Sequence, residues 1–176
     1  MNSPAEHKIL FTGTMGAGKT TAIATISEIP PISTDVQNND KSVSKAVTTV
    51  GLDYGELTLE GGDKLRLYGT PGQQRFDFMW KILGRGALGL VVLIDNSRPD
   101  PLADMAMFLD GFAELITQSA CVIGVGRMEA NPIPDIDCFA EALAARGMTC
   151  PVFAVDVREP EQVLQLLDLL LVQLEN

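Results

Sequence analysis

The chain has 176 residues, of which 46% are hydrophobic, and we predict a single domain over residues 1–176 with a buried core. Its formal net charge of −10 argues against nucleic-acid binding, because a protein that neutralises backbone phosphates needs a basic surface. The three cysteines have no metal-type spacing, so we expect reduced, mostly buried thiols at Cys121, Cys138 and Cys150.

The two ends of the chain predict no permanent membrane anchor. The first residues are polar and lack both the apolar run of a signal peptide and a Met-Gly start for myristoylation. The leucine-rich segment 163–174 is too short for a membrane span and contains Asp168, and no prenylatable cysteine follows it. We therefore expect a cytoplasmic location.

Strand-like and helix-like segments alternate along the chain. A first strand over residues 7–12 is followed by a glycine-rich turn and a helix over residues 19–28, which Pro30 ends. Residues 31–46 are poor in large apolar side chains and are expected to form a long, functional loop. The other predicted strands are residues 50–59, 64–68, 87–95, 121–125 and 151–155, and the other helices are residues 102–118, 135–146 and 161–174.

This alternation predicts an α/β domain. The run 87–95 is almost continuously apolar, which is typical of a parallel strand that is buried on both faces. Gly61 and Gly62 separate two strand-like runs and indicate a hairpin. We expect a mostly parallel six-stranded sheet with one antiparallel edge strand and helices on both faces.

The turn after the first strand has the pattern G-x-x-x-x-G-K-[ST]. It consists of Gly13, Thr14, Met15, Gly16, Ala17, Gly18, Lys19 and Thr20, with Thr21 following. The glycines let backbone N–H groups converge on a phosphate at the N-terminus of the helix. Lys19 is suited to the β- and γ-phosphate oxygens, and the Thr20 hydroxyl is suited to Mg²⁺. The motif in this setting predicts a nucleotide site, but P-loop ATPases and kinases use the same device.

Two further motifs occur downstream at suitable intervals. Thr48-Thr49-Val50-Gly51 closes the long loop, and Gly69-Thr-Pro-Gly-Gln-Gln-Arg-Phe76 follows a strand. With the P-loop, they resemble the Ras-like small GTPases from about residue 7 to the C-terminal helix. The GTPGQ variant is similar to a bacterial group of single-domain small GTPases. The resemblance implies a P-loop NTPase fold, GTP and GDP as ligands, and switch loops at about residues 30–49 and 69–80.

The resemblance also implies roles for individual residues. Thr49 corresponds to the switch I threonine that, with Thr20, ligates Mg²⁺ and reaches the γ-phosphate. Gly72 would offer its N–H to the γ-phosphate, and Gln73 would orient the attacking water while Lys19 stabilises the phosphates. These roles imply a signalling switch with hydrolase activity, whose partners are regulator or effector proteins that remain unidentified.

Two departures from the family pattern concern hydrolysis. The aspartate that usually opens switch II, and that holds Mg²⁺ through water, is Gly69 here. Asp53 and Asp95 are the nearest candidates to replace it, although each is expected to cap an element or face solvent. Met15 stands where a small residue often lies near the γ-phosphate, which predicts slow intrinsic hydrolysis that is assisted by an activating protein.

A third departure concerns the base. The guanine-specifying Asn-Lys-x-Asp motif is reduced to Gly126-Arg127-Met128-Glu129. The Glu129 carboxylate can accept two N–H donors from guanine, and Arg127 can lie over the base. Gly126 lacks the side-chain contacts that asparagine makes. The last base-contacting loop of the family corresponds to Asp156 and Val157, where backbone N–H groups would contact the base.

Other interpretations stay open at this point. A pseudo-GTPase that acts as a protein-binding module is favoured by Gly69 and by the reduced base motif. A P-loop ATPase or small-molecule kinase fits the P-loop alone. Around Trp80 lies an apolar cluster of Phe76, Phe78 and Met79. This cluster is expected to pack on the sheet rather than to form an effector surface.

Overall fold

The computed structural model describes residues 3–37 and 49–176. Its elements, in chain order, are β1 (Glu6–Gly13), α1 (Lys19–Ile26), β2 (Ile32–Gln37), β3 (Thr49–Thr58), β4 (Lys64–Gly69), the 3₁₀-helix η1 (Gln74–Phe76), α2 (Asp77–Gly84), β5 (Ala87–Asp95), α3 (Pro101–Gly111), α4 (Ala113–Gln118), β6 (Ala120–Gly126), α5 (Ile136–Ala145), β7 (Val152–Ala154) and α6 (Pro160–Val172).

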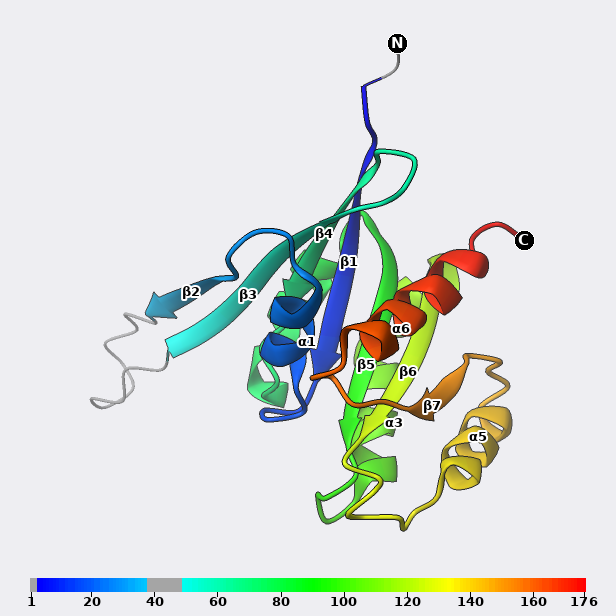
Figure 1. The fold of residues 1–176 in the computed structure, drawn as a ribbon. Coiled ribbons are helices and arrows are strands. Elements are labelled where there is room, and N and C mark those ends of the chain that lie inside the picture. The colour runs from blue at the N-terminus through cyan, green and yellow to red at the C-terminus, as the bar shows by residue number, and fades with distance from the viewer. Residues whose placement is uncertain (1–2, 38–48) are drawn as a thin grey trace.

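All strands belong to one sheet with the order β2-β3-β4-β1-β5-β6-β7 (Figure 1). β3 is antiparallel to both of its neighbours, and the pairs on either side of β1, β5 and β6 are parallel. The predicted α/β class and mostly parallel sheet are confirmed. The six predicted strands are present, and a seventh, β2, extends the sheet beyond β3.

β2 replaces the first part of the loop expected at residues 31–46, whereas the rest of that loop, residues 38–46, lies outside the described residues. The six residues of β2 pair with β3 in antiparallel register from Ile32 opposite Tyr54 to Gln37 opposite Thr49. An edge strand of this kind is held by main-chain hydrogen bonds to its neighbour, so it needs no apolar pattern of its own. β3 is therefore an internal strand rather than the edge that we expected.

Side chains alternate between the two faces of the sheet and divide the core in two. In β1, Ile9 and Phe11 pack under α1 and α6, whereas Leu10 packs on the opposite face under α3 and α5. β5 does the same, which explains its continuous apolar sequence, since both of its faces are covered. Figure 1 shows α1 and α6 together on the near face.

The helices begin at recognisable caps. The Asp100 side chain accepts a hydrogen bond from Ala103 N at 3.1 Å at the start of α3, with Pro101 in the first turn. Asp135 caps α5 in the same way through Cys138 N, also at 3.1 Å. The single helix expected over residues 102–118 is instead two, α3 and α4, which meet at the buried Phe112.

The cluster around Trp80 is divided between core and surface. Trp80 is 1% exposed, and its ring stacks on Phe112 at a centroid distance of 5.2 Å. Phe76 is also buried but belongs to neither core cluster, so the packing interpretation is confirmed for Trp80. Phe78 is 59% exposed and contradicts that interpretation, because it lies on the solvent side of α2.

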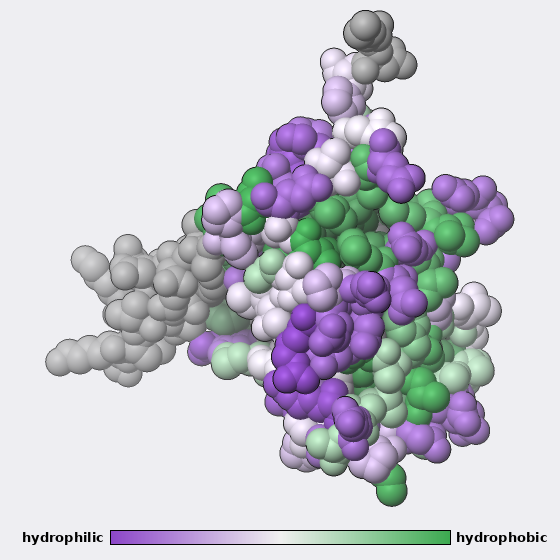
Figure 2. Space-filling model, in the orientation of Figure 1, coloured by the Kyte–Doolittle hydropathy of each residue, from purple (hydrophilic) through white to green (hydrophobic). Residues whose placement is uncertain are grey.

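The last helix has the predicted core stripe. Val163, Leu166, Leu167 and Leu170 are all buried against the sheet. The additional apolar residues Leu164, Leu169 and Val172 remain exposed, and apolar patches lie among polar ones on this face of the molecule (Figure 2). None of the helices in the described part of the chain combines the length and apolarity needed to cross a bilayer.

Candidate functional site

The loops that follow β1, β4, β6 and β7 meet at one end of the sheet and line a cavity of about 950 Å³. In open parallel sheets, ligands bind outside the carboxyl ends of the strands, so the position of this cavity is the expected one. The P-loop forms one wall, switch II residues form a second, and the loops after β6 and β7 form the third.

Glycine is required where the P-loop touches its neighbours. At Gly13, φ is +150°, and a Cβ would lie 2.2 Å from the carbonyl oxygen of Leu93. At Gly18, φ is +102°, and a Cβ would lie 2.7 Å from a methyl group of Val157. The loop therefore fits against β5 and against the loop after β7 only because these positions carry no side chain.

The N-terminus of α1 is open toward the cavity. Gly18 is the N-cap residue, it supplies no side-chain hydrogen bond, and the first turn contains no acidic residue. Uncapped N–H groups at the positive end of a helix dipole form a site for an anion such as a phosphate.

Lys19 supplies a cation at the same place. Its Nζ donates hydrogen bonds of 2.7 Å to the carbonyl oxygens of Gly13 and Thr14, which hold the ammonium beneath the loop. Burial lowers the pKa of Lys19 to about 8, and the nearby negative charge of Asp53 opposes this shift. A phosphate group arriving at the loop would therefore meet a fixed, partly desolvated ammonium group.

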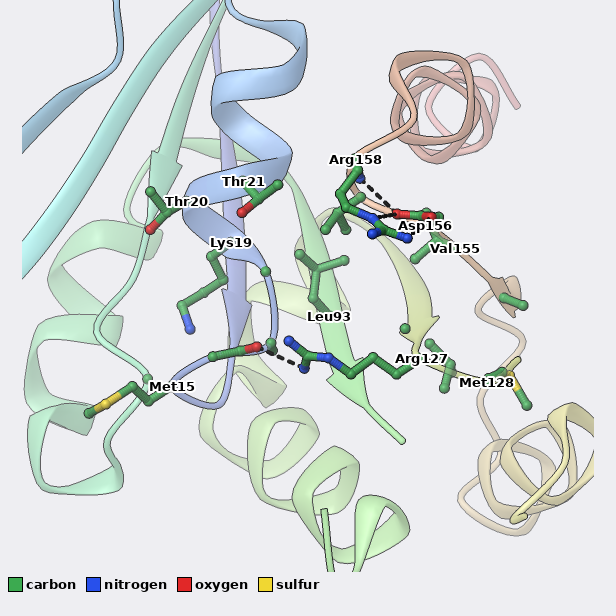
Figure 3. A pocket seen from close by; sticks show the side chains of 18 of the residues that line it. Met15, Lys19, Thr20, Thr21, Leu93, Arg127, Met128, Val155, Asp156 and Arg158 are labelled. Atoms are coloured by element: carbon green, nitrogen blue, oxygen red, sulfur yellow. Dashed lines mark hydrogen bonds and ion pairs between the residues drawn. The ribbon is translucent and has the colours of Figure 1, made fainter. Parts of the chain in front are cut away.

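Thr20 and Thr21 stand above the loop on the first turn of α1. Both side chains line the cavity (Figure 3). The Thr20 hydroxyl donates a hydrogen bond of 2.6 Å to Oδ2 of Asp53, a residue of β3. A hydroxyl and a carboxylate beside a phosphate loop are hard oxygen donors of the kind that Mg²⁺ prefers.

Switch II begins where β4 ends and is fixed to the body of the protein at two points. The buried hydroxyl groups of Thr70 and Thr12 share a hydrogen bond of 2.7 Å, and Nε1 of Trp80 donates to the carbonyl oxygen of Pro71 at 2.9 Å. Gly72 follows and lies against the P-loop, where a Cβ would be 2.5 Å from the backbone nitrogen of Met15.

Gln73 and Met15 lie at the phosphate end of the cavity. Both residues line it, and the Met15 side chain is 65% exposed. Figure 3 shows Met15 extending away from Lys19 along the loop. The two residues singled out for hydrolysis are therefore on the same side of the pocket as the P-loop lysine.

Arg127 lies at the end of β6 and reaches back across the cavity. Its Nη1 donates to the carbonyl oxygen of Gly16 at 3.0 Å and to Oδ2 of Asp95 at 2.5 Å. Arg127 is the one non-glycine residue of the described chain with positive φ, at +60°. A non-glycine residue in this region carries backbone strain that is found most often at functional sites.

Asp95 corrects an expectation from the sequence. We expected it to cap an element or face solvent, but it is 7% exposed, and its two carboxylate oxygens are occupied. Oδ2 pairs with Arg127, and Oδ1 accepts hydrogen bonds from the N–H and hydroxyl of Ser97 at 2.9 and 2.6 Å. Its burial is tolerated because the charge is paired.

The far end of the cavity carries both signs of charge. Glu129 is exposed and lines the pocket two residues after Arg127. Opposite it, Asp156 and Arg158 form an ion pair of 2.8 Å, and hydrogen bonds from Arg158 lower the pKa of Asp156 to about 2. The Asp156 N–H donates to Oε1 of Gln162 at 2.7 Å.

The structure brings most of the predicted site residues to one cavity. Those that line it are Met15, Gly16, Ala17, Gly18, Lys19, Thr20, Thr21, Gly72, Gln73, Arg127, Glu129, Asp156 and Val157. Gly13 and Thr14, the first residues of the loop, are not among the lining residues, but their carbonyl oxygens accept the hydrogen bonds from Lys19. Thr49 begins β3, but its side chain, like Thr48 as a whole, lies outside the described residues.

The sequence interpretation missed several members of the site. Thr70, Gln162 and Arg158 line the cavity without having been singled out, and Asp53 was considered only as one of two candidates. Thr70 and Arg158 follow the ends of β4 and β7, Asp53 lies within β3 opposite Gly69, and Gln162 lies in the first turn of α6. Position alone, however, does not separate them from ordinary loop residues.

Comparison with known proteins agrees with this geometry. Residues 33–125, just over half of the chain, match a family described as "conserved hypothetical ATP binding protein". A stretch of 93 residues is 32% identical to the uncharacterized protein MJ1339 of Methanocaldococcus jannaschii, and covers 53% of each chain.

Two small GTPases are also similar. Over 131 residues the chain is 26% identical to the GTP-binding protein YPT1 of Saccharomyces cerevisiae, covering 72% of this chain and 58% of that one. Over 91 residues it is 31% identical to the Ras-related protein Rab-8A of Gallus gallus, covering 50% and 39%. The matched region thus spans about half the length of these relatives. The chain therefore has a fold of the P-loop, small-GTPase-like kind, and it belongs to the family described as conserved hypothetical ATP binding protein.

Proposed function

We propose that this chain is a GTP- and GDP-binding switch with slow hydrolysis, built on the nucleotide-binding P-loop fold of its relatives. The observation that carries the proposal is the position of Arg127 and Glu129. Arg127 joins the end of β6 to the P-loop through Gly16, and Glu129 follows at the end of the cavity away from Lys19. A base recognised there would have its phosphates on the P-loop.

Glu129 is suited to guanine. A carboxylate is an acceptor only, and it can take two parallel N–H donors, which guanine presents on one edge. Adenine presents an acceptor at the corresponding ring nitrogen, which a carboxylate would repel. The exposed carboxylate of Glu129 is therefore a reason to prefer guanine, although Gly126 lacks the side chain of the usual asparagine.

The phosphates would be held by the P-loop amides and by Lys19, with Gly72 donating its N–H to the γ-phosphate. The residues present also fit Mg²⁺, because Thr20 offers a hard hydroxyl oxygen at the phosphate end, and Thr49 is the second proposed ligand. The described residues contain no cluster of three or more His, Cys, Asp or Glu side chains for a metal. Mg²⁺ bound with few protein ligands, the phosphates supplying the others, neutralises charge on the phosphate oxygens.

Hydrolysis would depend on the position of the attacking water rather than on a strong general base. Gln73 lies at the phosphate end of the cavity and would orient the attacking water, while Lys19 stabilises charge on the phosphates. Met15 lies on the P-loop against Gly72, and its 65% exposed side chain would crowd an arginine supplied by another protein or the approach of that water. We therefore propose a slow intrinsic rate that an activating protein increases.

Regulators and effectors would bind near the switch loops at about residues 30–49 and 69–80. Phe78 and Ile82 on α2 are 59% and 57% exposed, and apolar side chains of this size favour protein interfaces. We propose a single, cytoplasmic signalling domain that acts through such partners.

A second candidate function is ATP binding. It is favoured by the description of the matched family and by the loss of the guanine-contacting asparagine at Gly126. In this case the P-loop would work in the same way, and Glu129 would be a solvated surface residue.

Calorimetric titration of nucleotide-free protein with GDP, GTP and ATP, with and without Mg²⁺, tests the proposal. We expect guanine nucleotides to bind and ATP to be excluded. We also expect Glu129→Ala to weaken GDP binding by about 10- to 100-fold, the value of two hydrogen bonds to a charged group. Glu141→Ala, which removes an exposed carboxylate on α5 outside the cavity, is the matched control.

If ATP binds as tightly as GTP and GDP or more tightly, the proposal of a guanine-nucleotide switch is refuted and the ATP-binding function is supported. Failure to bind any of the three nucleotides would leave a protein-binding module that has kept the fold.

A further inference from the structure

The cavity contains a carboxylate that the family pattern does not place there. Asp53 extends from β3 to the start of α1, where its Oδ2 accepts the 2.6 Å hydrogen bond from Thr20. Thr20 is the P-loop hydroxyl proposed to bind Mg²⁺. A carboxylate within hydrogen-bond distance of that hydroxyl lies in the region where the cation would be bound.

Asp53 is also the direct cross-strand neighbour of Gly69. The two residues are opposite one another in the antiparallel pair of β3 and β4. A Cβ added to Gly69 would lie 3.1 Å from the Cβ of Asp53 and 3.1 Å from its Oδ2. A side chain at position 69 would therefore project into the space that the Asp53 carboxylate occupies.

This geometry explains the missing aspartate of switch II. A Cβ at position 69 would already be closer to Asp53 than ordinary van der Waals contact, and like charges directly opposite one another on a sheet are destabilising. One carboxylate in this space is compatible with the fold, and it can come from either strand.

We propose that Asp53 replaces the switch II aspartate and holds the nucleotide-bound Mg²⁺ through a water molecule, the carboxylate having moved from β4 to the neighbouring strand β3. The proposal rests on the proposed nucleotide-binding function. Outer-sphere carboxylates of this kind orient the metal's water ligands, and their removal costs about 10- to 100-fold in metal affinity.

The other candidate, Asp95, is committed elsewhere. Its Oδ2 is paired with Arg127 and its Oδ1 accepts two hydrogen bonds from Ser97, and neither partner is a residue of the P-loop. Asp53 instead touches the threonine of the P-loop. Of the two carboxylates, Asp53 is therefore the one placed for the cation.

The test measures how strongly Mg²⁺ slows the release of a bound nucleotide. The probe is the fluorescent N-methylanthraniloyl derivative of GDP, or of ADP if titration shows that adenine is preferred. Release is timed in excess Mg²⁺ and in EDTA, and the ratio of the two rates is the readout, which needs no hydrolysis. We expect Asp53→Asn, which keeps the shape and an acceptor oxygen, to lower this ratio about 10-fold or more.

Glu56→Gln is the matched control, because it removes the same charge from the same strand, where Glu56 bonds to Tyr54 instead of Thr20. A second pair of variants tests the relocation itself. Asp53→Gly should lose the Mg²⁺ effect, and the double variant Asp53→Gly with Gly69→Asp should recover it, because the carboxylate returns to the same space from β4.

The outcomes separate the two proposals. If the wild-type chain binds nucleotide and Asp53→Asn retains the full Mg²⁺ effect, the role of Asp53 is refuted and the switch proposal stands. If the wild-type chain binds nucleotide without any Mg²⁺ effect, the role of Asp53 is likewise refuted. If the wild-type chain binds no nucleotide, the proposed function itself fails.

Discussion

Removal of the Trp80 side chain should destabilise the protein and weaken the attachment of switch II to α3. Trp80 is 1% exposed, packs on Phe108 and Phe112 at centroid distances of 5.0 and 5.2 Å, and donates to the carbonyl oxygen of Pro71. Trp80→Ala would leave a cavity between α2 and α3 and an unpaired carbonyl in switch II.

The expected cost is large. Truncation of a buried tryptophan to alanine lowers the free energy of unfolding by about 3–5 kcal/mol, a substantial part of the stability of a small domain. Trp80→Phe keeps an aromatic ring but loses the hydrogen bond to Pro71, so we expect an intermediate loss of about 1–3 kcal/mol. Phe78→Ala, on the exposed side of the same helix, should stay within about 0.5 kcal/mol of the wild type.

The assay is urea unfolding of nucleotide-free protein, since a bound ligand would add its own stabilisation. Far-UV circular dichroism must follow the transition, because Trp80 is the one tryptophan of the chain and the variants lose its fluorescence. A cost below about 1 kcal/mol for Trp80→Ala, or an equal cost for Phe78→Ala, would refute the assignment of Trp80 as the anchor of switch II.

Three further predictions concern the P-loop and the contact of Trp80 with α3. Lys19→Ala should weaken binding of every nucleotide at least about 100-fold in calorimetry, because it removes the buried cation of the phosphate site. Met15→Gly should raise the single-turnover rate of GTP hydrolysis, and an unchanged, already fast rate would exclude crowding by Met15. Gly111→Ala should cost about 1–3 kcal/mol in urea unfolding, since its Cβ would lie 2.5 Å from the Trp80 ring, whereas Gly84→Ala, with 3.5 Å to Leu115, should be tolerated.

The sequence predicts those parts of the fold that local patterns determine. The run 87–95 is apolar up to its last residue, Asp95, because β5 is covered on both faces, and the P-loop follows from eight consecutive residues. β2 is different, since Ile32–Gln37 contains Ser33, Thr34 and Asp35 and has no strand-like alternation. It is a strand because it pairs with the edge of β3. Pairing between two separate segments cannot be predicted from the residue pattern of either segment alone.

The candidate site also has one part that local motifs predict and another part that depends on long-range contacts. Lys19, Thr20 and Gln73 could be predicted because each belongs to a motif with fixed spacing. The pairing of Asp95 with Arg127 joins residues 32 positions apart, and the contact of Asp53 with Thr20 joins residues 33 positions apart. Both contacts depend on the order of strands in the sheet, which the sequence constrains only loosely.

The same long-range contacts connect base recognition to phosphate binding. Arg127 holds the Gly16 carbonyl, Gly18 fits against Val157, and the Thr25 hydroxyl donates to the carbonyl oxygen of Val157 at 3.0 Å. The loops after β6 and β7 thus support the P-loop directly, so a change in either loop alters the phosphate site as well.

Arg127 and Glu129 should therefore differ in what they affect, although they are two residues apart. Arg127→Ala removes a support of the P-loop and leaves Asp95 without its partner, so we expect GDP and ATP affinities to fall by a similar factor, about 10-fold. Glu129→Ala should lower GDP affinity alone, because the Glu129 carboxylate would act on the base. Calorimetry on both variants with both nucleotides distinguishes these effects. If Arg127→Ala selectively weakened guanine binding, Arg127 would be a base-reading residue, and its contact with Gly16 would be incidental.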